Sequence, residues 1–190
     1  MWRGASVRAV ALIWAMALFA PLWAMAGTRI ESNFVQFDFS NPDDIARLDK
    51  SIDFGESGGW FAASTPAAAQ ERLLRKIDAI YLKVQRILDM RKLMQPKVLL
   101  RVASNEDELA EIFVQIFKRR GVARAWYIYE HNTIYINARD VNEGMIAHEL
   151  AHAIIDHYLS ARPPRASAEI LATYVDKSLF DEVKTRNDFR

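Results

Sequence analysis

AWYIYEHNTIYINARDVNEGMIAHELAH, residues 125–152, is the stretch that decides which fold we expect. Residues 125–129 and 133–137 are aromatic and β-branched runs joined by three polar residues, which is typical of a β-hairpin. Asp140 and Glu143 have the spacing of a capping box, so we expect a helix to open there and to run to about residue 160. A hairpin followed directly by a helix therefore forms the centre of the predicted domain.

The predicted helix carries His148-Glu149-Leu150-Ala151-His152, with two histidines four residues apart. Residues at this spacing are rotated by about 40° and separated by about 6 Å along the axis, so both imidazoles can grip one zinc ion. Glu149 lies about 100° around the helix from His148, beside the ion rather than on it. There it can take a proton from a zinc-activated water and pass it to a leaving amine. The pattern predicts a catalytic zinc site with Glu149 as the base; the alternative is a chance string on an amphipathic helix.

A catalytic zinc site needs a third protein ligand and an open position for water. His157 lies about half a turn off the ligand face, and Asp156 lies about 12 Å along the axis from His148, so neither fits. The third ligand must come from the next helix, which the proline pair at residues 163–164 starts. Glu169 on that helix is the candidate, and the alternative is an ordinary solvated glutamate.

The pattern His148-Glu149-x-x-His152 followed by Glu169 resembles the gluzincin metallopeptidases, the peptidase MA clan that includes thermolysin. The run PPRASAEILATY at residues 163–174 is similar to the Pro…Glu-Gly-x-Ala-x-Tyr stretch of small, single-domain peptidases of this kind. The resemblance implies a zinc metallopeptidase.

For residues 125–180, the resemblance also implies an α+β, zincin-like fold. Such a domain has a small twisted sheet with backing helices, an HExxH active-site helix and a following glutamate helix. The first strand of the hairpin would be the sheet edge along which a peptide substrate lies. This edge strand comprises Trp126, Tyr127, Ile128 and Tyr129.

Two departures from the family pattern leave one role open. Ile170 replaces the usual glycine after the glutamate, and no histidine follows His157 to stabilise the transition state. The candidates for the oxyanion-side donor or for a hydrogen bond to a ligand histidine are Tyr174, Thr173, Tyr158, Tyr129 and Arg165.

Before the central stretch, the sequence predicts a strand within residues 27–40, a loop at 54–64 and a long helix from residue 65 to Pro96. A buried strand at 97–102 and a helix at 105–120 follow. After the central stretch, we expect a last helix to about residue 180. Val35, Phe37 and Phe39 alternate on one side of the first strand. Ser104 is the predicted cap of the 105–120 helix, and Gly121 its predicted end.

Composition limits the classes of protein that we consider. The 190 residues suit one domain, and 51% hydrophobic and 26% charged residues are ordinary for a globular protein. A formal net charge of +1 gives no general reason to expect a nucleic-acid partner. The chain has no cysteine, which excludes disulfides, thiolate metal ligands and a cysteine nucleophile.

The N-terminus has the organisation of a signal peptide at residues 1–26. Arg3 and Arg8 precede an apolar stretch at residues 9–20, and the small-x-small sequence AMA follows at residues 24–26. We therefore expect export to the periplasm or secretion; an uncleaved signal anchor is the alternative.

The expected mature chain divides into an N-terminal strand and loop segment at residues 27–64 and a zincin-like metallopeptidase domain at residues 65–190. We expect an exported, monomeric zinc peptidase that acts on peptide or protein substrates, with Zn²⁺ as its cofactor. We expect no nucleic-acid partner and no membrane contact after removal of the signal peptide. One alternative is a non-catalytic, zinc-bound module that binds a peptide or partner protein along the same edge strand. Another is a membrane-anchored interaction module with an accidental motif.

Overall fold

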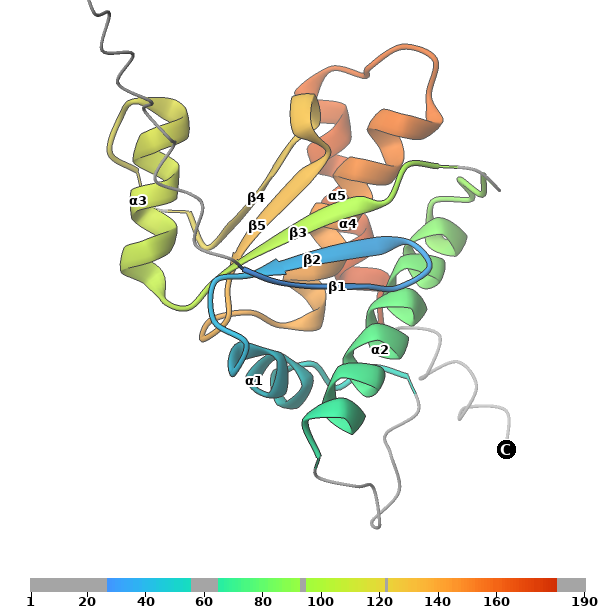
Figure 1. The fold of residues 1–190 in the computed structure, drawn as a ribbon. Helices are drawn as coiled ribbons and strands as arrows, with labels where there is room; N and C mark the ends of the chain where they lie inside the picture. The colour runs from blue at the N-terminus through green and yellow to red at the C-terminus, as the bar shows by residue number, and fades with distance from the viewer. Residues whose placement is uncertain (1–26, 56–64, 93–94, 122, 181–190) are drawn as a thin grey trace, which may run out of the picture.

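The computed structural model describes residues 27–55, 65–92, 95–121 and 123–180, which form an α+β fold (Figure 1). In chain order the elements are β1 (Thr28–Glu31), β2 (Val35–Phe39), α1 (Asp44–Ser51), α2 (Pro66–Ile87), β3 (Val98–Ala103), α3 (Glu106–Phe117), β4 (Ala125–Ile128), the 3₁₀ helix η1 (Tyr129–His131), β5 (Thr133–Asn137), α4 (Glu143–Tyr158) and α5 (Arg165–Ser178). The predicted signal peptide and most of the predicted loop at 54–64 lie outside the described residues. Among the helices described, none combines the length and hydropathy that a membrane span requires.

The strands form one mixed sheet in the order β1-β2-β3-β5-β4. Its three central strands are parallel, and the two edge strands β1 and β4 are antiparallel to their neighbours. One row of paired residues crosses all five strands: Ile30, Phe37, Leu100, Ile134 and Tyr127. Paired residues point to the same face of a sheet, so this row forms the floor of the main core.

Helix α4 lies between this face of the sheet and α5, and both helices lie behind the sheet in Figure 1. The central residues of α4, Ala147, Leu150 and Ala151, are fully buried. A helix covered on two sides needs apolar residues around most of its circumference, as α4 has. Ala172 of α5 is also fully buried, and its small side chain allows the two helices to pack closely. The motif helix is therefore one of the most firmly packed elements of the protein.

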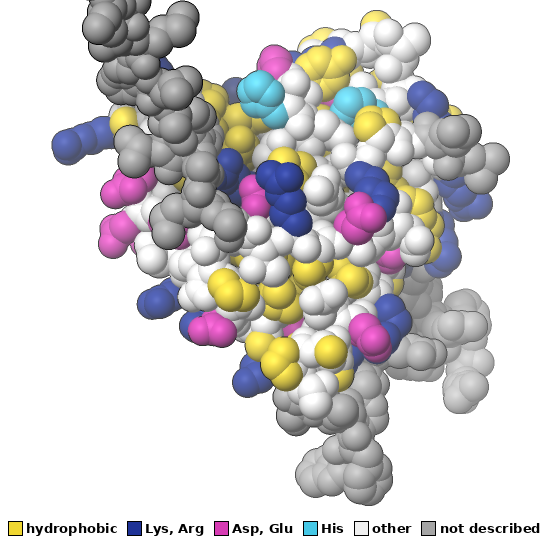
Figure 2. Space-filling view, in the orientation of Figure 1, with side chains coloured by type: hydrophobic (Ala, Val, Ile, Leu, Met, Phe, Trp, Pro, Cys, Tyr) yellow, Lys and Arg dark blue, Asp and Glu magenta, His cyan; other side chains and the backbone are white. Residues whose placement is uncertain are grey.

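The second face of the sheet is covered by α3 at the corner formed by β3, β5 and β4. Leu109 and Ile112 of α3 pack with Tyr135 and Ile128 in a separate, smaller core. Trp126 stacks on Tyr135 with ring centroids 5.2 Å apart. Figure 2 views the molecule from the side opposite α4 and α5, where side chains of both charges are interspersed among hydrophobic ones.

Three predicted helix boundaries were wrong. Helix α2 ends at Ile87, well before Pro96, because the chain turns where Asp89 adopts a left-handed φ of 51°. The cap of α3 is Asn105 rather than Ser104, and its side chain accepts a hydrogen bond from the Glu108 N–H. The same helix ends at Phe117, before Gly121, because the next residue adopts the left-handed conformation.

The predicted capping box of α4 was also wrong. Asn142 is the N-cap, and its side chain accepts a hydrogen bond from the Met145 N–H at 2.9 Å. Asp140 instead forms an ion pair with Arg124. The helix consequently begins at Glu143 and not near residue 140.

One strand prediction was incomplete and another was wrong. The predicted strand within residues 27–40 is present as β2, with Val35, Phe37 and Phe39 buried on one side, and β1 pairs with it in an antiparallel hairpin. Tyr129 was predicted at the end of the edge strand but lies in η1, so the strand ends at Ile128. A further helix, α1, follows the hairpin.

Candidate metal centre

The predicted ligands lie on two adjacent antiparallel helices. Glu169 of α5 contacts His148 and His152 in the middle of α4, whereas Asp176, later in α5, lies against Gly144 at the start of α4. The turn between the helices contains the proline pair, and α5 begins directly after Pro164. This reversal of the chain brings Glu169 beside residues that precede it by 17 and more positions.

Three side chains converge on one point. The Oε2 atom of Glu169 lies 3.5 Å from Nε2 of His148 and 3.5 Å from Nε2 of His152. Their ligand atoms all lie within 4.8 Å of one another, and within the described ranges this is the one group of three or more such side chains that could hold a metal. Ligands of tetrahedral zinc, with bonds of about 2.0–2.2 Å, lie about 3.4 Å apart. The donor set and its spacing therefore fit zinc.

The exposure of the three side chains suits an accessible site. His148 is 25% exposed, His152 15% and Glu169 43%, so solvent reaches the point where they meet. Burial lowers the pKa of His152, although the Glu169 carboxylate acts in the opposite direction. A lowered pKa favours the neutral imidazole, which is the form that binds metal. The exposed Arg165 lies 3.6 Å from the other oxygen of Glu169.

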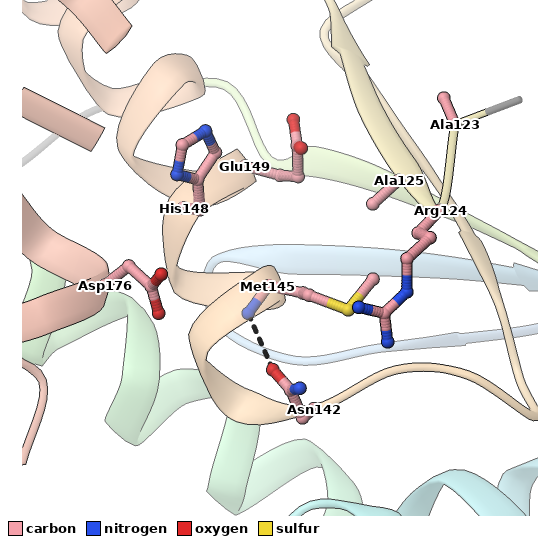
Figure 3. Close-up of a pocket in the computed structure, with 8 residues that line it drawn as sticks. All are labelled: Ala123, Arg124, Ala125, Asn142, Met145, His148, Glu149 and Asp176. Atoms are coloured by element: carbon pink, nitrogen blue, oxygen red, sulfur yellow. Dashed lines mark hydrogen bonds between the residues drawn. The ribbon is translucent and has the colours of Figure 1, made fainter. Parts of the chain in front are cut away.

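Glu149 is placed differently from the three ligands. It is only 9% exposed, and Figure 3 shows it on α4 between His148 and Ala125 of β4. The pKa of Glu149 is raised to about 7, chiefly by burial and also by the nearby Glu169 carboxylate, against the opposing effect of a hydrogen bond from the backbone N–H of Tyr127. The Glu149 carboxylate therefore lies next to the three candidate ligands His148, His152 and Glu169, which we call the metal group. It is shielded from bulk water and hydrogen-bonded to the edge strand.

Beside Glu149 lies a pocket of about 450 Å³. Its walls come from the start of β4, the first turns of α4 and the end of α5, and the lining residues are Ala123, Arg124, Ala125, Asn142, Met145, His148, Glu149 and Asp176 (Figure 3). Because His148 and Glu149 form part of the wall, a molecule in the pocket would adjoin the metal group.

Strand β4 is an edge strand, so one side of its backbone has no partner strand in the described sheet. Tyr127 points to the face that α4 covers, and Trp126 points to the face that α3 covers. The Tyr127 hydroxyl contacts Nε2 of His157 at 3.3 Å. Side chains on both faces of β4 are thus packed against helices. The outer edge of the strand lies beside the metal group, since the Tyr127 backbone contacts Glu149.

No family model, curated protein or solved structure matches this chain. The interpretation of the site therefore rests on the geometry of its own residues.

Of the candidate oxyanion donors, Arg165 contacts the ligand Glu169, whereas Tyr158, Tyr174 and Thr173 do not come together with the ligands. Tyr158 lies about 9 Å along the axis of α4 beyond His152 and on another side of the helix. Tyr174 is 56% exposed and lies about 140° around α5 from Glu169. Thr173 is exposed and, in the part of the chain that the structure describes, makes no hydrogen bond to either histidine.

Residues at the far end of α4 have structural partners instead. Tyr129 stacks on His157, and Arg162 lies over the Tyr129 ring at 4.8 Å. Asp156, which has a side chain only 5% exposed, forms an ion pair with Arg162 at 3.2 Å. His157 and Asp156 thus have structural contacts of their own, away from the metal group.

Sequence reasoning missed three features of the site: the Tyr127 backbone hydrogen bond to Glu149, the Arg124–Asp140 ion pair, and Asp176 in the pocket wall. The first two join residues that no short motif connects. Asp176 did leave a signal, because it lies seven positions after Glu169 and this spacing returns to the same face of a helix.

Proposed function

We propose that this protein is an exported zinc-dependent peptidase that hydrolyses peptide bonds with water. His148, His152 and Glu169 would hold the zinc ion, and Glu149 would act as the general base. The observation that carries the proposal is the division of roles among the four side chains. Three converge on one point, while the fourth lies beside them, buried and hydrogen-bonded to an edge strand.

A bound zinc ion would supply Lewis acidity, which activates a water molecule and polarises the scissile carbonyl. The Glu149 carboxylate is positioned to accept the proton of the attacking water and to donate it to the amine that leaves. Its hydrogen bond to the Tyr127 N–H fixes its orientation, and its burial strengthens its electrostatic effect on a neighbouring charge. A purely structural metal site has no use for such a group.

The edge strand supports a peptide as the substrate. An extended peptide can add to an exposed sheet edge through backbone hydrogen bonds, and β4 offers such an edge beside Glu149. The order of hairpin, HExxH helix and glutamate helix is also the order that the gluzincin resemblance implies. The α+β architecture is consistent with a zincin-like domain, and this assignment forms part of the proposal.

One observation favours a second candidate, a zinc-bound module that binds peptides without cleaving them. Of the predicted oxyanion donors, Tyr158 and Tyr174 lie away from the three ligands, and Arg165, which contacts Glu169, is 93% exposed. The edge strand would serve such a module equally well.

Hydrolysis of a peptide library tests the proposal against this alternative. The protein purified without residues 1–26 is stripped with a chelator, and one portion is reloaded with one equivalent of zinc. We expect cleavage products, identified by mass spectrometry, from the reloaded portion alone. Stoichiometric zinc binding without cleavage of any peptide would favour the binding module.

A further inference from the structure

The pocket beside the metal group has two walls of different character. Met145, Ala123 and Ala125 provide an apolar surface, suited to the methylene stem of a long side chain. His148 and Glu149 lie on the side of the metal group, whereas Arg124 lies on the β4 side and Asp176 on the α5 side (Figure 3). Away from the metal group, the charges of Arg124 and Asp176 decide which side chain the pocket favours.

Asp176 presents a free carboxylate to the pocket. Among the residues described, no hydrogen bond or ion pair engages it. Its Oδ1 atom lies so close to Gly144 that a Cβ atom at that position would be 2.3 Å away. The glycine therefore permits the carboxylate to lie against the first turn of α4. Asp176 also shares the face of α5 that carries Glu169, about 10 Å further along the axis.

Arg124, by contrast, is already paired. Its Nε donates a hydrogen bond to Asp140 at 2.6 Å, and its Nη2 atom contacts the other oxygen of the same carboxylate. A two-point arginine–carboxylate pair is among the stronger ion pairs, and it offsets the charge that Arg124 would bring to the pocket. Of these two groups, Asp176 is the one whose charge has no partner among the described residues.

We propose that this pocket selects a lysine or arginine side chain of the substrate peptide and that Asp176 determines the preference. The inference rests on the proposed peptidase function. The pocket lies at the N-terminal end of β4, so a peptide that pairs antiparallel with β4 places its C-terminal half there. In this orientation the basic side chain is that of a residue on the C-terminal side of the cleaved bond.

Binding and cleavage are measured separately to test this. Fluorescently labelled peptides of equal length with blocked ends carry lysine, arginine, glutamine, leucine or glutamate at one varied position. Their affinity for the zinc-loaded E149Q variant is measured by anisotropy, with and without the additional change D176N. The cleavage sites of the zinc-loaded wild-type protein in the same peptides are mapped by mass spectrometry.

D89N is the matched control. Asp89 is exposed, it has the left-handed φ of 51° that asparagine tolerates, and it follows the end of α2. Lys92, close by, contacts the carbonyl of His157 in the last turn of α4, whereas the pocket lies at the first turns of that helix. D89N thus makes the same charge change at the opposite end of α4.

We expect lysine and arginine peptides to bind about 3–10-fold more tightly than the glutamine peptide, as one partly solvated charge pair allows. D176N should abolish this preference, D89N should keep it, and cleavage should occur before the basic residue. A preference for glutamate, an unchanged preference in D176N, or no charge preference would overturn the inference. Cleavage without charge preference would leave the peptidase proposal standing. Basic peptides that bind through Asp176 but are never cleaved would sustain the inference and refute the peptidase.

Discussion

Substitution of Glu149 by glutamine should stabilise the metal-free protein at pH 8. At pH 4 the same substitution should have a much smaller stabilising effect. The reason lies in the burial of this carboxylate, which raises its pKa from 4.5 to about 7. In the unfolded chain, Glu149 loses its proton near pH 4.5, whereas in the folded protein it keeps the proton until near pH 7. Its contribution to stability is therefore fully present below pH 4.5, falls as the pH rises, and is lost above pH 7.

The size of the effect follows from the two pKa values. A shift of one pKa unit corresponds to about 1.4 kcal/mol, so the rise of the Glu149 pKa from 4.5 to about 7 corresponds to about 3 kcal/mol. Glutamine cannot ionise, and E149Q avoids this loss. The free energy of unfolding of E149Q relative to wild type should therefore increase by about 3 kcal/mol between pH 4 and pH 8.

Urea unfolding at both pH values, with a chelator present, measures this difference. Glu71 on α2 supplies the control, because its side chain is 73% exposed. The change E71Q should alter the free energy of unfolding by less than about 0.5 kcal/mol at either pH. Equal differences for E149Q at pH 4 and pH 8 would refute the reasoning, since the carboxylate would then be solvated in the folded protein.

Three further predictions concern the metal group, the smaller core and the N-terminus. E169A should weaken zinc binding by at least about 10–100-fold in competition with a chelating dye, and an unchanged affinity would place the third ligand elsewhere. W126A should lower the free energy of unfolding by about 3 kcal/mol in urea, because it removes the stack on Tyr135; a loss below about 1 kcal/mol would mean that α3 does not depend on this ring. N-terminal sequencing of the protein from an exporting cell should begin at Gly27, and a chain that still begins near Met1 would contradict cleavage.

The metal group could be predicted because its geometry is local. Helical periodicity places His148 and His152 on one face, and the proline pair reverses the chain so that Glu169 returns to them. The edge position of the strand at residues 125–128 came from a resemblance, and the sheet order agrees with it. Each of these features depends on neighbours within about twenty residues of sequence.

The features that escaped prediction depend on more distant contacts. The spacing of Asp140 and Glu143 indicated a capping box, but Asp140 pairs with Arg124 sixteen residues earlier, and Asn142 caps the helix instead. The parallel pairing of β2 with β3 brings together residues more than sixty positions apart, which no periodicity reveals. Local patterns identify the elements, whereas long-range partners decide where each one begins and ends.

The most direct test of the central claim compares E149Q with the wild-type protein in zinc content and in hydrolysis of the same peptide library. Glu149 lies beside the three ligands and not among them, so E149Q should fold and keep one zinc ion per chain. Loss of the general base alone should slow peptide hydrolysis by about 10²–10⁴-fold. Equal rates of hydrolysis in E149Q and wild type, or loss of zinc from the variant, would contradict the role that the structure suggests for this carboxylate.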